Sequence, residues 1–314
     1  MYDFTDTVER FVGDIVSGSI PPGYTVFKYI RSTGTRSTDS QTIINNFATS
    51  LTTALALCTS ETNQILVLLP GHSEAVGTAM FTSAPTGVKI IGVGNVDEDG
   101  APTLLWSGGT SNLAIAAKNT MIANVRLIAN ANDVTEAITV TGAGFKLVGC
   151  HVDMGVTSSL DAASFLNFST GANDGLVCAN TMRATVASNA LATFVKGNTV
   201  VDNLRIVGNR VIGLSSSTTV GAIHISAALT NLFISGNYVD NQVASSVGAI
   251  TFTDVAATGL VCDNECGTLA NAAVVTSQGI TVAGTTNILV HFNQNFSSDG
   301  LKGTSGSIAP IVTT

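Results

Sequence analysis

Three groups of residues in this 314-residue chain have types and spacings that could support chemistry. His72 and Glu74 could form an acid–base pair. Asp174 and Asp202 lie 28 positions apart and could stack as two carboxylates. The run 97–100, Asp-Glu-Asp-Gly, resembles half of a calcium-binding loop. Each pattern is also typical of a turn, where short polar side chains bond to nearby backbone, and we expect the structural role in all three.

The other candidates do not converge on one site. His151, His224 and His291 stand at different positions relative to the repeat described below, so no histidine cluster is predicted. Ser216 has no histidine and aspartate in register with it, which argues against a nucleophile. Cys262 and Cys266 lack a second pair or a nearby histidine cluster, which argues against zinc. We therefore predict no catalytic, cofactor-binding or metal-binding residue, and we expect the protein not to be an enzyme.

A repeat organises most of the chain. Leu176, Leu204, Leu232, Leu260 and Ile288 are each 28 positions apart, and each begins a short apolar phrase. Similar phrases with more variable spacing begin at Val88, Thr120 and Phe145. A second apolar phrase precedes several of them, at Ala137, Ala222, Ala249 and Gly279. Each repeat therefore carries at least two short strands.

These phrases are too short for helical repeats, which need ten or more residues of 3.6-residue periodicity. A propeller blade of about 40 to 50 residues would be longer and antiparallel. The sequence instead predicts an all-β fold, a right-handed parallel β-helix, with about nine coils from Ile65 to Asn295. At a strand separation of roughly 4.8 Å, the rod would be on the order of 40 Å long.

Stacking predicts which side chains face the interior. The residues two positions after each anchor should form an inward column, in which each member contacts the coils above and below: Leu147, Cys178, Ile206, Ile234, Cys262 and Val290. Glycines and asparagines follow at a sharp corner, where both tolerate a left-handed backbone: Gly149, Gly208, Gly236, Asn209, Asn237 and Asn293. Stacked asparagines could also hydrogen-bond along the rod.

The ends of the chain differ from the repeat. Residues 41–62 are predicted to contain an amphipathic helix, from about Thr42 to Thr59 and capped near Asp39, which covers the first coil. The β-helix itself is assigned to residues 63–300. The tail, residues 301–314, has no helical pattern, and the last coil would need a partner to cover it.

Residues 1–40 form an N-terminal arm that is rich in aromatic side chains and arginine, the composition of interface cores. Two interpretations stay open: the arm docks on another protein or a neighbouring subunit, or it packs along its own rod. The residues expected at such an interface are Phe4, Arg10, Phe11, Tyr24, Phe27, Tyr29 and Arg31.

Composition limits the partners. The net charge of −8 and the scattered lysines and arginines argue against nucleic acid and membrane surfaces. Mean hydropathy is positive, yet no run approaches the roughly 18 apolar residues of a spanning helix. The acidic start does not match a signal peptide. Five cysteines without framework spacing are consistent with reduced thiols in a cytosol.

The runs 65–76, 86–94 and 101–104, which follow a predicted helix containing alanine and cysteine, resemble β-helix virion proteins of tailed bacteriophages. The likeness covers roughly Thr42 to Asn130. It implies a structural, capsid-associated decoration or cement protein, a homotrimer that binds the major capsid protein on the head surface after synthesis in the host cytoplasm. As a hypothesis, the arm anchors to the capsid, and deleting residues 1–40 would abolish attachment while leaving the rod folded.

The alternative is a tail-associated or tailspike-type β-helix that binds or cleaves host polysaccharide. Host glycan is a partner only under this alternative. Sugar platforms commonly use exposed tryptophan and tyrosine, yet Trp106 is the single tryptophan and no tyrosine lies between Tyr29 and Tyr238. We therefore favour the decoration protein.

Overall fold

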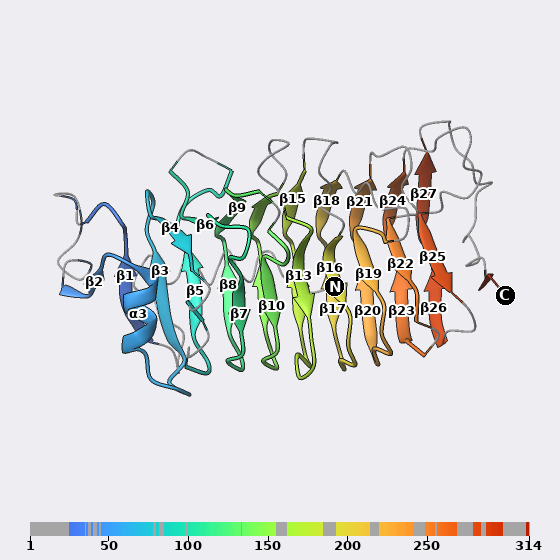
Figure 1. Ribbon diagram of the computed structural model, residues 1–314, viewed down its shortest axis with the longest axis horizontal. Coiled ribbons are helices and arrows are strands. Elements are labelled where there is room, and N and C mark those ends of the chain that lie inside the picture. The colour runs from blue at the N-terminus through green and yellow to red at the C-terminus, as the bar shows by residue number, and fades with distance from the viewer. Residues whose placement is uncertain are drawn as a thin grey trace.

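The computed structural model describes residues 25–34, 36, 39, 43, 45–77, 80–81, 85–97, 100–132, 134–154, 162–184, 193–213, 220–241, 249–254, 256–268, 279–283, 287–297 and 312–313. These residues form an elongated right-handed parallel β-helix, with helix α3 at the N-terminal end (Figure 1). The predicted fold class is therefore confirmed. Each full coil contributes one strand to each of three parallel sheets, called A, B and C here.

Sheet A runs the length of the rod. Its strands, in spatial order, are β2 (Phe47–Ala48), β1 (Thr25–Ile30), β3 (Gln64–Leu68), β5 (Lys89–Gly92), β8 (Met121–Ala123), β11 (Lys146–Val148), β14 (Leu176–Cys178), β17 (Arg205–Val207), β20 (Leu232–Ser235), β23 (Thr258–Cys262) and β26 (Asn287–His291).

Sheets B and C form the other two walls. Sheet B has nine strands: β4 (Ser73–Val76), β6 (Thr103–Trp106), β9 (Arg126–Ala129), β12 (His151–Asp153), β15 (Thr181–Arg183), β18 (Arg210–Gly213), β21 (Tyr238–Asn241), β24 (Glu265–Thr268) and β27 (Gln294–Ser297). Sheet C has eight: β7 (Leu113–Ile115), β10 (Ile138–Val140), β13 (Ser164–Phe168), β16 (Thr193–Gly197), β19 (Ile223–Ile225), β22 (Ile250–Phe252), β25 (Ile280–Ala283) and β28 (Val312–Thr313).

The corner between sheets A and B has a constant construction. From the coil of β8 onward, two residues separate the sheet A strand from the sheet B strand, as Gly208 and Asn209 do between β17 and β18. The first residue has a left-handed backbone with φ between 50° and 65° in every one of these coils. Glycine suits this position because it has no Cβ to clash, and Gly149, Gly208 and Gly236 occupy it as predicted.

Asparagine occupies the second corner position in the later coils and forms a buried ladder. Its members are Asn180, Asn209, Asn237, Asn264 and Asn293, spaced 29, 28, 27 and 29 residues apart. Each of the first four side-chain amides donates to the Oδ1 of the next asparagine at 2.8–2.9 Å. That same Oδ1 also accepts the backbone N–H of the preceding asparagine. The predicted hydrogen bonding along the rod is confirmed, with two members that the sequence pattern missed.

The inward column of sheet A corrects the predicted core. Strand pairing aligns Leu66, Ile90, Ile122, Leu147, Val177, Ile206, Ile234, Val261 and Val290. Four of the six predicted members are in it, but Cys178 and Cys262 are not. Cys178 pairs with Val148 and Val207, and Cys262 pairs with Ser235 and His291. Both cysteines are shifted by one residue, which moves a side chain to the opposite face of a strand.

At Cys178 the predicted register failed because sheet A is apolar on both faces in that part of the rod. Cys178 belongs to a second buried cluster, separate from the interior, that also contains Val67, Ile91, Ala123 and Val148. With apolar residues at successive positions, hydrophobicity does not show which side chain points inward. From Leu147 to Val290 the paired residues of the inward column are 27 to 30 positions apart, so the constant spacing of 28 is a property of the chosen anchors.

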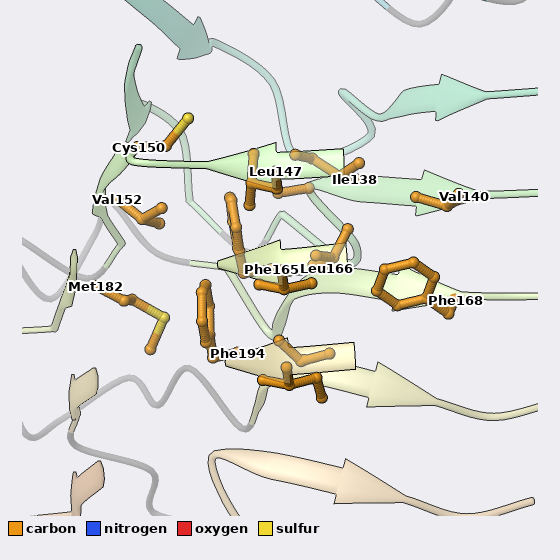
Figure 2. Close-up of a cluster of buried hydrophobic side chains, with 14 of the residues drawn as sticks. Ile138, Val140, Leu147, Cys150, Val152, Phe165, Leu166, Phe168, Met182 and Phe194 are labelled. Carbon is orange, nitrogen blue, oxygen red and sulfur yellow. The ribbon is translucent and has the colours of Figure 1, made fainter. Parts of the chain in front are cut away.

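The rod interior is filled by aliphatic and aromatic side chains from all three sheets. Phe165 on β13 stacks on Phe194 of β16, with ring centroids 5.4 Å apart and an interplanar angle of 12°. Figure 2 shows both rings facing Val152 and Met182 of sheet B. Trp106 contacts Phe165 edge-on and donates from Nε1 to the Ala137 carbonyl at 2.7 Å. All five cysteines are free, and four of them are buried in this apolar packing or on sheet A.

The N-terminal end departs from the predicted layout. Thr25–Ile30 is a strand that pairs with β3, so part of the predicted arm belongs to sheet A. Phe47 and Ala48, predicted to be helical, form strand β2 beside β1. Helix α3 is shorter than expected, Leu51–Leu57, and its N-cap is Ser50 instead of a residue near Asp39. Leu51, Ala54 and Leu55 join the interior cluster, so the helix closes this end of the core.

Two side chains satisfy the start of α3. The Ser50 hydroxyl accepts the Thr53 backbone N–H at 3.0 Å. The Glu74 carboxylate, from β4, accepts the backbone N–H groups of Leu51 and Thr52 at 2.5 and 3.2 Å. Burial raises the pKa of Glu74, but nearby His72 and the hydrogen bonds from Leu51 and Thr52 together lower it below its usual value. Glu74 therefore has the structural role expected from the sequence.

Candidate ligand site

A set of polar side chains converges on the outward face of sheet B. Strand pairing puts Arg126, His151, Thr181 and Arg210 in one column on β9, β12, β15 and β18. The residues between outward positions, such as Val152 and Met182, are buried in the core, because successive side chains of a strand point to opposite faces. The column members therefore lie on the outward face of four consecutive coils.

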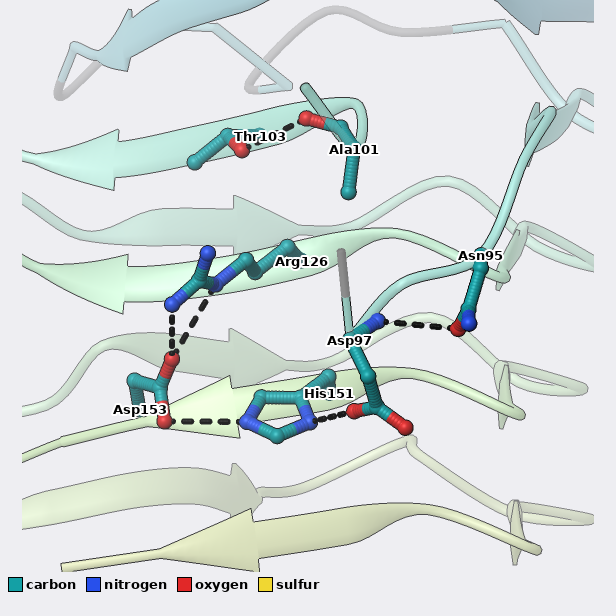
Figure 3. Close-up of polar contacts among 7 residues, drawn as sticks. All are labelled: Asn95, Asp97, Ala101, Thr103, Arg126, His151 and Asp153. Carbon is teal, nitrogen blue, oxygen red and sulfur yellow. Dashed lines mark hydrogen bonds and ion pairs between the residues drawn. The ribbon is translucent and has the colours of Figure 1, made fainter. Parts of the chain in front are cut away.

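A second, shorter column lies beside the first. Asp153, two residues after His151 on β12, pairs with Arg183 on β15. Figure 3 shows that Asp153 contacts both His151 and Arg126. Its Oδ2 accepts hydrogen bonds from Nε and Nη2 of Arg126 at 3.1 and 2.8 Å. Its Oδ1 lies 2.9 Å from Nε2 of His151.

The connection between β5 and β6 brings another carboxylate to the site. Asp97 lies between β5 and β6, 54 positions before His151, and its Oδ1 is 2.5 Å from the histidine Nδ1 (Figure 3). The Asp97 side chain is 65% exposed, whereas that of His151 is 7% exposed. His151 therefore bridges a partly buried carboxylate on its own strand and an exposed carboxylate from a loop.

The two carboxylates favour the protonated form of the histidine. Each ring nitrogen faces a carboxylate oxygen, so both must carry a proton to donate both bonds. The hydrogen bond to Asp153 raises the pKa of His151, burial opposes this, and Asp97 raises it further. Burial raises the pKa of Asp153, but bonds from His151 and Arg126 outweigh it and lower the pKa below its usual value. The geometry, with one carboxylate oxygen at each ring nitrogen, therefore favours the charged form of His151.

These residues line an open hollow with a volume of about 390 Å³. Its lining consists of Asp97, Arg126, His151, Asp153, Thr181, Arg183 and Arg210. Every lining side chain is polar, and Arg183 and Arg210 are exposed. The hollow offers guanidinium donors beside carboxylate acceptors. Chemically, it is suited to bind a molecule that carries both an anionic group and hydroxyl groups.

Replacing His151 with glutamine is expected to lower the free energy of unfolding by about 1 kcal/mol below pH 6.5, through loss of charge-assisted bonds. The folded-state pKa is raised, so this stabilisation is fully present below the unfolded pKa and is lost as pH rises through the folded pKa. Asp97, Asp153 and Arg126 are the charged groups around the ring. Denaturant unfolding of both proteins from pH 5 to 9 measures this. A difference that grows with pH would contradict it.

The predicted interface residues fall into two groups. Phe4, Arg10, Phe11 and Tyr24 lie outside the described residues. Phe27 and Tyr29 lie on β1 and pack partly buried against the rod's two apolar clusters. Arg31 is 4% exposed, forms an ion pair with Asp39 at 2.8 Å, and donates to the Pro70 carbonyl. For these three residues, packing along the rod is the observed arrangement.

The remaining sequence candidates have structural partners. Asp174 and Asp202 do stack at one corner, where Asp174 N–H donates to the Asp202 carbonyl and Asp174 has a left-handed backbone. Their carboxylates accept bonds from Asn203 and from Thr230 with Asn231, respectively, which extends a polar ladder on the surface. His224 bonds to the Thr251 hydroxyl on the next coil. Ser216 lies outside the described residues.

The sequence predicted no cluster of histidines, and it did not predict the aspartates around His151. His151, His224 and His291 do not cluster, as expected, but His151 gathers two aspartates. The His-x-Asp spacing at 151–153 could have indicated part of this, because residues two apart on a strand share a face. Asp97 offered no such signal.

The described residues lack two further features. No group of three or more histidine, cysteine or acidic side chains among them is arranged to hold a metal ion. Within the same part of the chain, no helix has the length and apolar character needed to cross a membrane. Comparison of the chain with protein-family models, curated proteins and solved structures returned no match.

Proposed function

We propose that this protein is a structural component of a tailed-phage virion, a decoration or cement protein on the outer surface of the head. The observation that carries the proposal is the shape: three sheets form long walls around a closed apolar interior. Such a rod offers extended surface for contact with neighbours. The likeness of residues 42–130 to β-helix virion proteins also supports this function.

The proposal includes self-association, with a homotrimer as the expected assembly. Support comes from an apolar strip on the outward face of sheet A in the last three coils. Phe233 and Leu260 are half-buried and pair in one column with Leu289, which is 59% exposed; Phe292 is 69% exposed. Exposed apolar strips mark contact surfaces, and symmetric homo-oligomers are the general expectation.

Attachment to the major capsid protein is proposed to depend on the first 24 residues. The sequence hypothesis used a deletion of residues 1–40, but that deletion would remove β1 and the Arg31–Asp39 ion pair from the rod. A chain that begins at Thr25 retains both. We expect this truncated protein to fail to bind bare capsids in a co-sedimentation assay, while the full-length protein saturates them.

Thermal unfolding of the two proteins provides the control, since the truncation should leave the rod folded. Saturation of capsids by the truncated protein would contradict attachment through these residues. Saturation by neither protein would contradict the decoration function itself.

The alternative function is a tail-associated protein that binds or cleaves host polysaccharide. The polar hollow on sheet B is the observation that favours it, because it combines arginine donors with carboxylate acceptors. Electron micrographs of virions labelled with antibody to this protein separate the two functions. Label around the head supports decoration, and label confined to the tail supports the alternative.

A further inference from the structure

The hollow on sheet B is lined by more cationic side chains than its aspartates can pair with. Arg126 and His151 are paired with Asp97 and Asp153. Two cationic lining residues are left over, Arg183 and Arg210. This excess is local, because the whole chain carries a net charge of −8.

Within the part of the chain that the structure describes, neither surplus arginine forms an ion pair. The Arg183 guanidinium has no ion-pair or hydrogen-bond partner among the described residues, although its strand neighbour is Asp153. Arg210 lies over the Tyr238 ring, with its Cζ 5.9 Å from the ring centroid, and this stacking leaves its N–H groups able to donate to a ligand. Both guanidiniums can therefore donate to a ligand.

Strand register puts these two donors close together. Arg210 is the direct neighbour of Thr181 on the adjacent coil, and Arg183 lies two residues further along the strand of Thr181. Two guanidiniums and a hydroxyl thus border the same part of the hollow. Planar guanidinium groups bind carboxylates through paired hydrogen bonds.

We propose that this hollow binds an acidic saccharide, with Arg183 and Arg210 holding the sugar carboxylate and the carboxylates of Asp97 and Asp153 accepting hydrogen bonds from sugar hydroxyls. The inference goes beyond the proposed decoration function and deepens the alternative function, because it names the class of sugar that the hollow would bind. Binding is the claim, and no bond of the sugar is made or broken.

The mixed lining favours a sugar acid over a bare inorganic anion. Phosphate at neutral pH has few donors to offer, and it would be repelled by two fixed carboxylates. A sugar acid presents hydroxyl donors beside its carboxylate, so both halves of the lining find partners. Leaving buried polar groups without partners costs binding free energy.

The same lining favours a sugar over an acidic peptide. None of the seven side chains around the hollow is apolar. A peptide segment brings apolar side-chain carbons that would gain nothing from this surface. A saccharide brings hydroxyl groups on most of its carbons, which match the alternating donors and acceptors.

Isothermal titration of the full-length protein with a glucuronate-containing disaccharide tests the proposal. We expect measurable binding that is lost when glucuronate is replaced by glucose, which differs by the carboxylate. Inorganic phosphate and triglutamate are the other probes, and both should bind at least tenfold more weakly. Absence of glucuronate binding, or equal binding of the glucose disaccharide, would overturn the proposal. Tighter binding of phosphate or of triglutamate would also overturn it.

Variants locate the binding to the hollow. The double variant Arg183→Gln with Arg210→Gln should weaken glucuronate binding at least tenfold. Both positions are exposed, so the fold should be retained, which thermal unfolding checks. Arg205→Gln is the matched control, because Arg205 is exposed on sheet A, where it lies over the Phe233 ring. Equal affinity of the double variant and the control would place the binding elsewhere and refute this site.

Discussion

Replacing Asn237 with alanine is expected to lower the free energy of unfolding by about 3–5 kcal/mol, since several buried polar groups lose their partners together. The Asn237 Oδ1 accepts both the backbone N–H and the side-chain amide of Asn209. Its amide donates to the Ile206 carbonyl at 2.9 Å and to Asn264 at 2.8 Å. Asn237 is 1% exposed, so water cannot replace these bonds without opening the corner.

Urea unfolding of the wild-type and Asn237→Ala proteins measures this effect. Asn287→Ala makes the same substitution at an exposed position in β26 and should change stability by less than about 0.5 kcal/mol. Asn237→Asp keeps the acceptor but loses the donor and buries a charge, so it should be no more stable than the alanine variant. A loss below about 1 kcal/mol for Asn237→Ala would show that the ladder contributes little.

Replacing Phe165 with alanine is expected to cost about 3–5 kcal/mol through loss of apolar contact and a cavity that the core fills only partly. Phe165 is fully buried between Trp106 and Phe194, with centroid distances of 6.4 and 5.4 Å. Neighbours from all three walls surround it (Figure 2). Because strands from several coils fix these neighbours, they have little freedom to move into the space.

The matched control is Phe233→Ala, since Phe233 is half-buried on the outward face of sheet A. That substitution leaves no enclosed cavity and should cost about 1 kcal/mol. Phe165→Leu should fall between the wild-type and Phe165→Ala proteins. Thermal unfolding followed by circular dichroism ranks the three variants, and equal losses at positions 165 and 233 would contradict the role assigned to the stacked rings.

The fold class could be predicted because two sequence signals agree. Short β-branched phrases recur at coil spacing, and glycine followed by asparagine marks the same corner, as in Gly208-Asn209 and Gly236-Asn237. The apolar phrases predict the strands, and the repeated glycine–asparagine corner predicts that successive coils stack. Ala179 and Asp263 take the left-handed position without glycine, so the pattern hid Asn180 and Asn264 from the predicted ladder.

The strand β1 and the start of α3 could not be predicted from the repeat. Thr25–Ile30 has no matching phrase at coil spacing, and it joins sheet A because it pairs with β3. Ile43 and Phe47 fit a helical face together with Leu51. In the structure, however, Phe47 lies in β2 and pairs with Tyr29 of β1. Tertiary pairing overrides a local periodicity of this kind.

The candidate site depends on contacts that sequence spacing does not contain. Arg126, His151 and Arg210 become neighbours only after the coil register is fixed, and an error of one residue would move them to the interior face. Asp97 reaches His151 from a connection whose path is set by the surrounding coils. The surplus charge of the hollow is therefore a property of the assembled walls.

The asparagine corner also constrains how the rod can change over evolution. Every coil from β14 onward presents the same asparagine corner to the next coil. A whole coil can therefore be duplicated or lost without changing the contacts at that corner. A single-residue insertion at this corner would instead interrupt the hydrogen bonds between the stacked asparagine amides. The length of the rod can thus vary in increments of one coil, roughly 4.8 Å each.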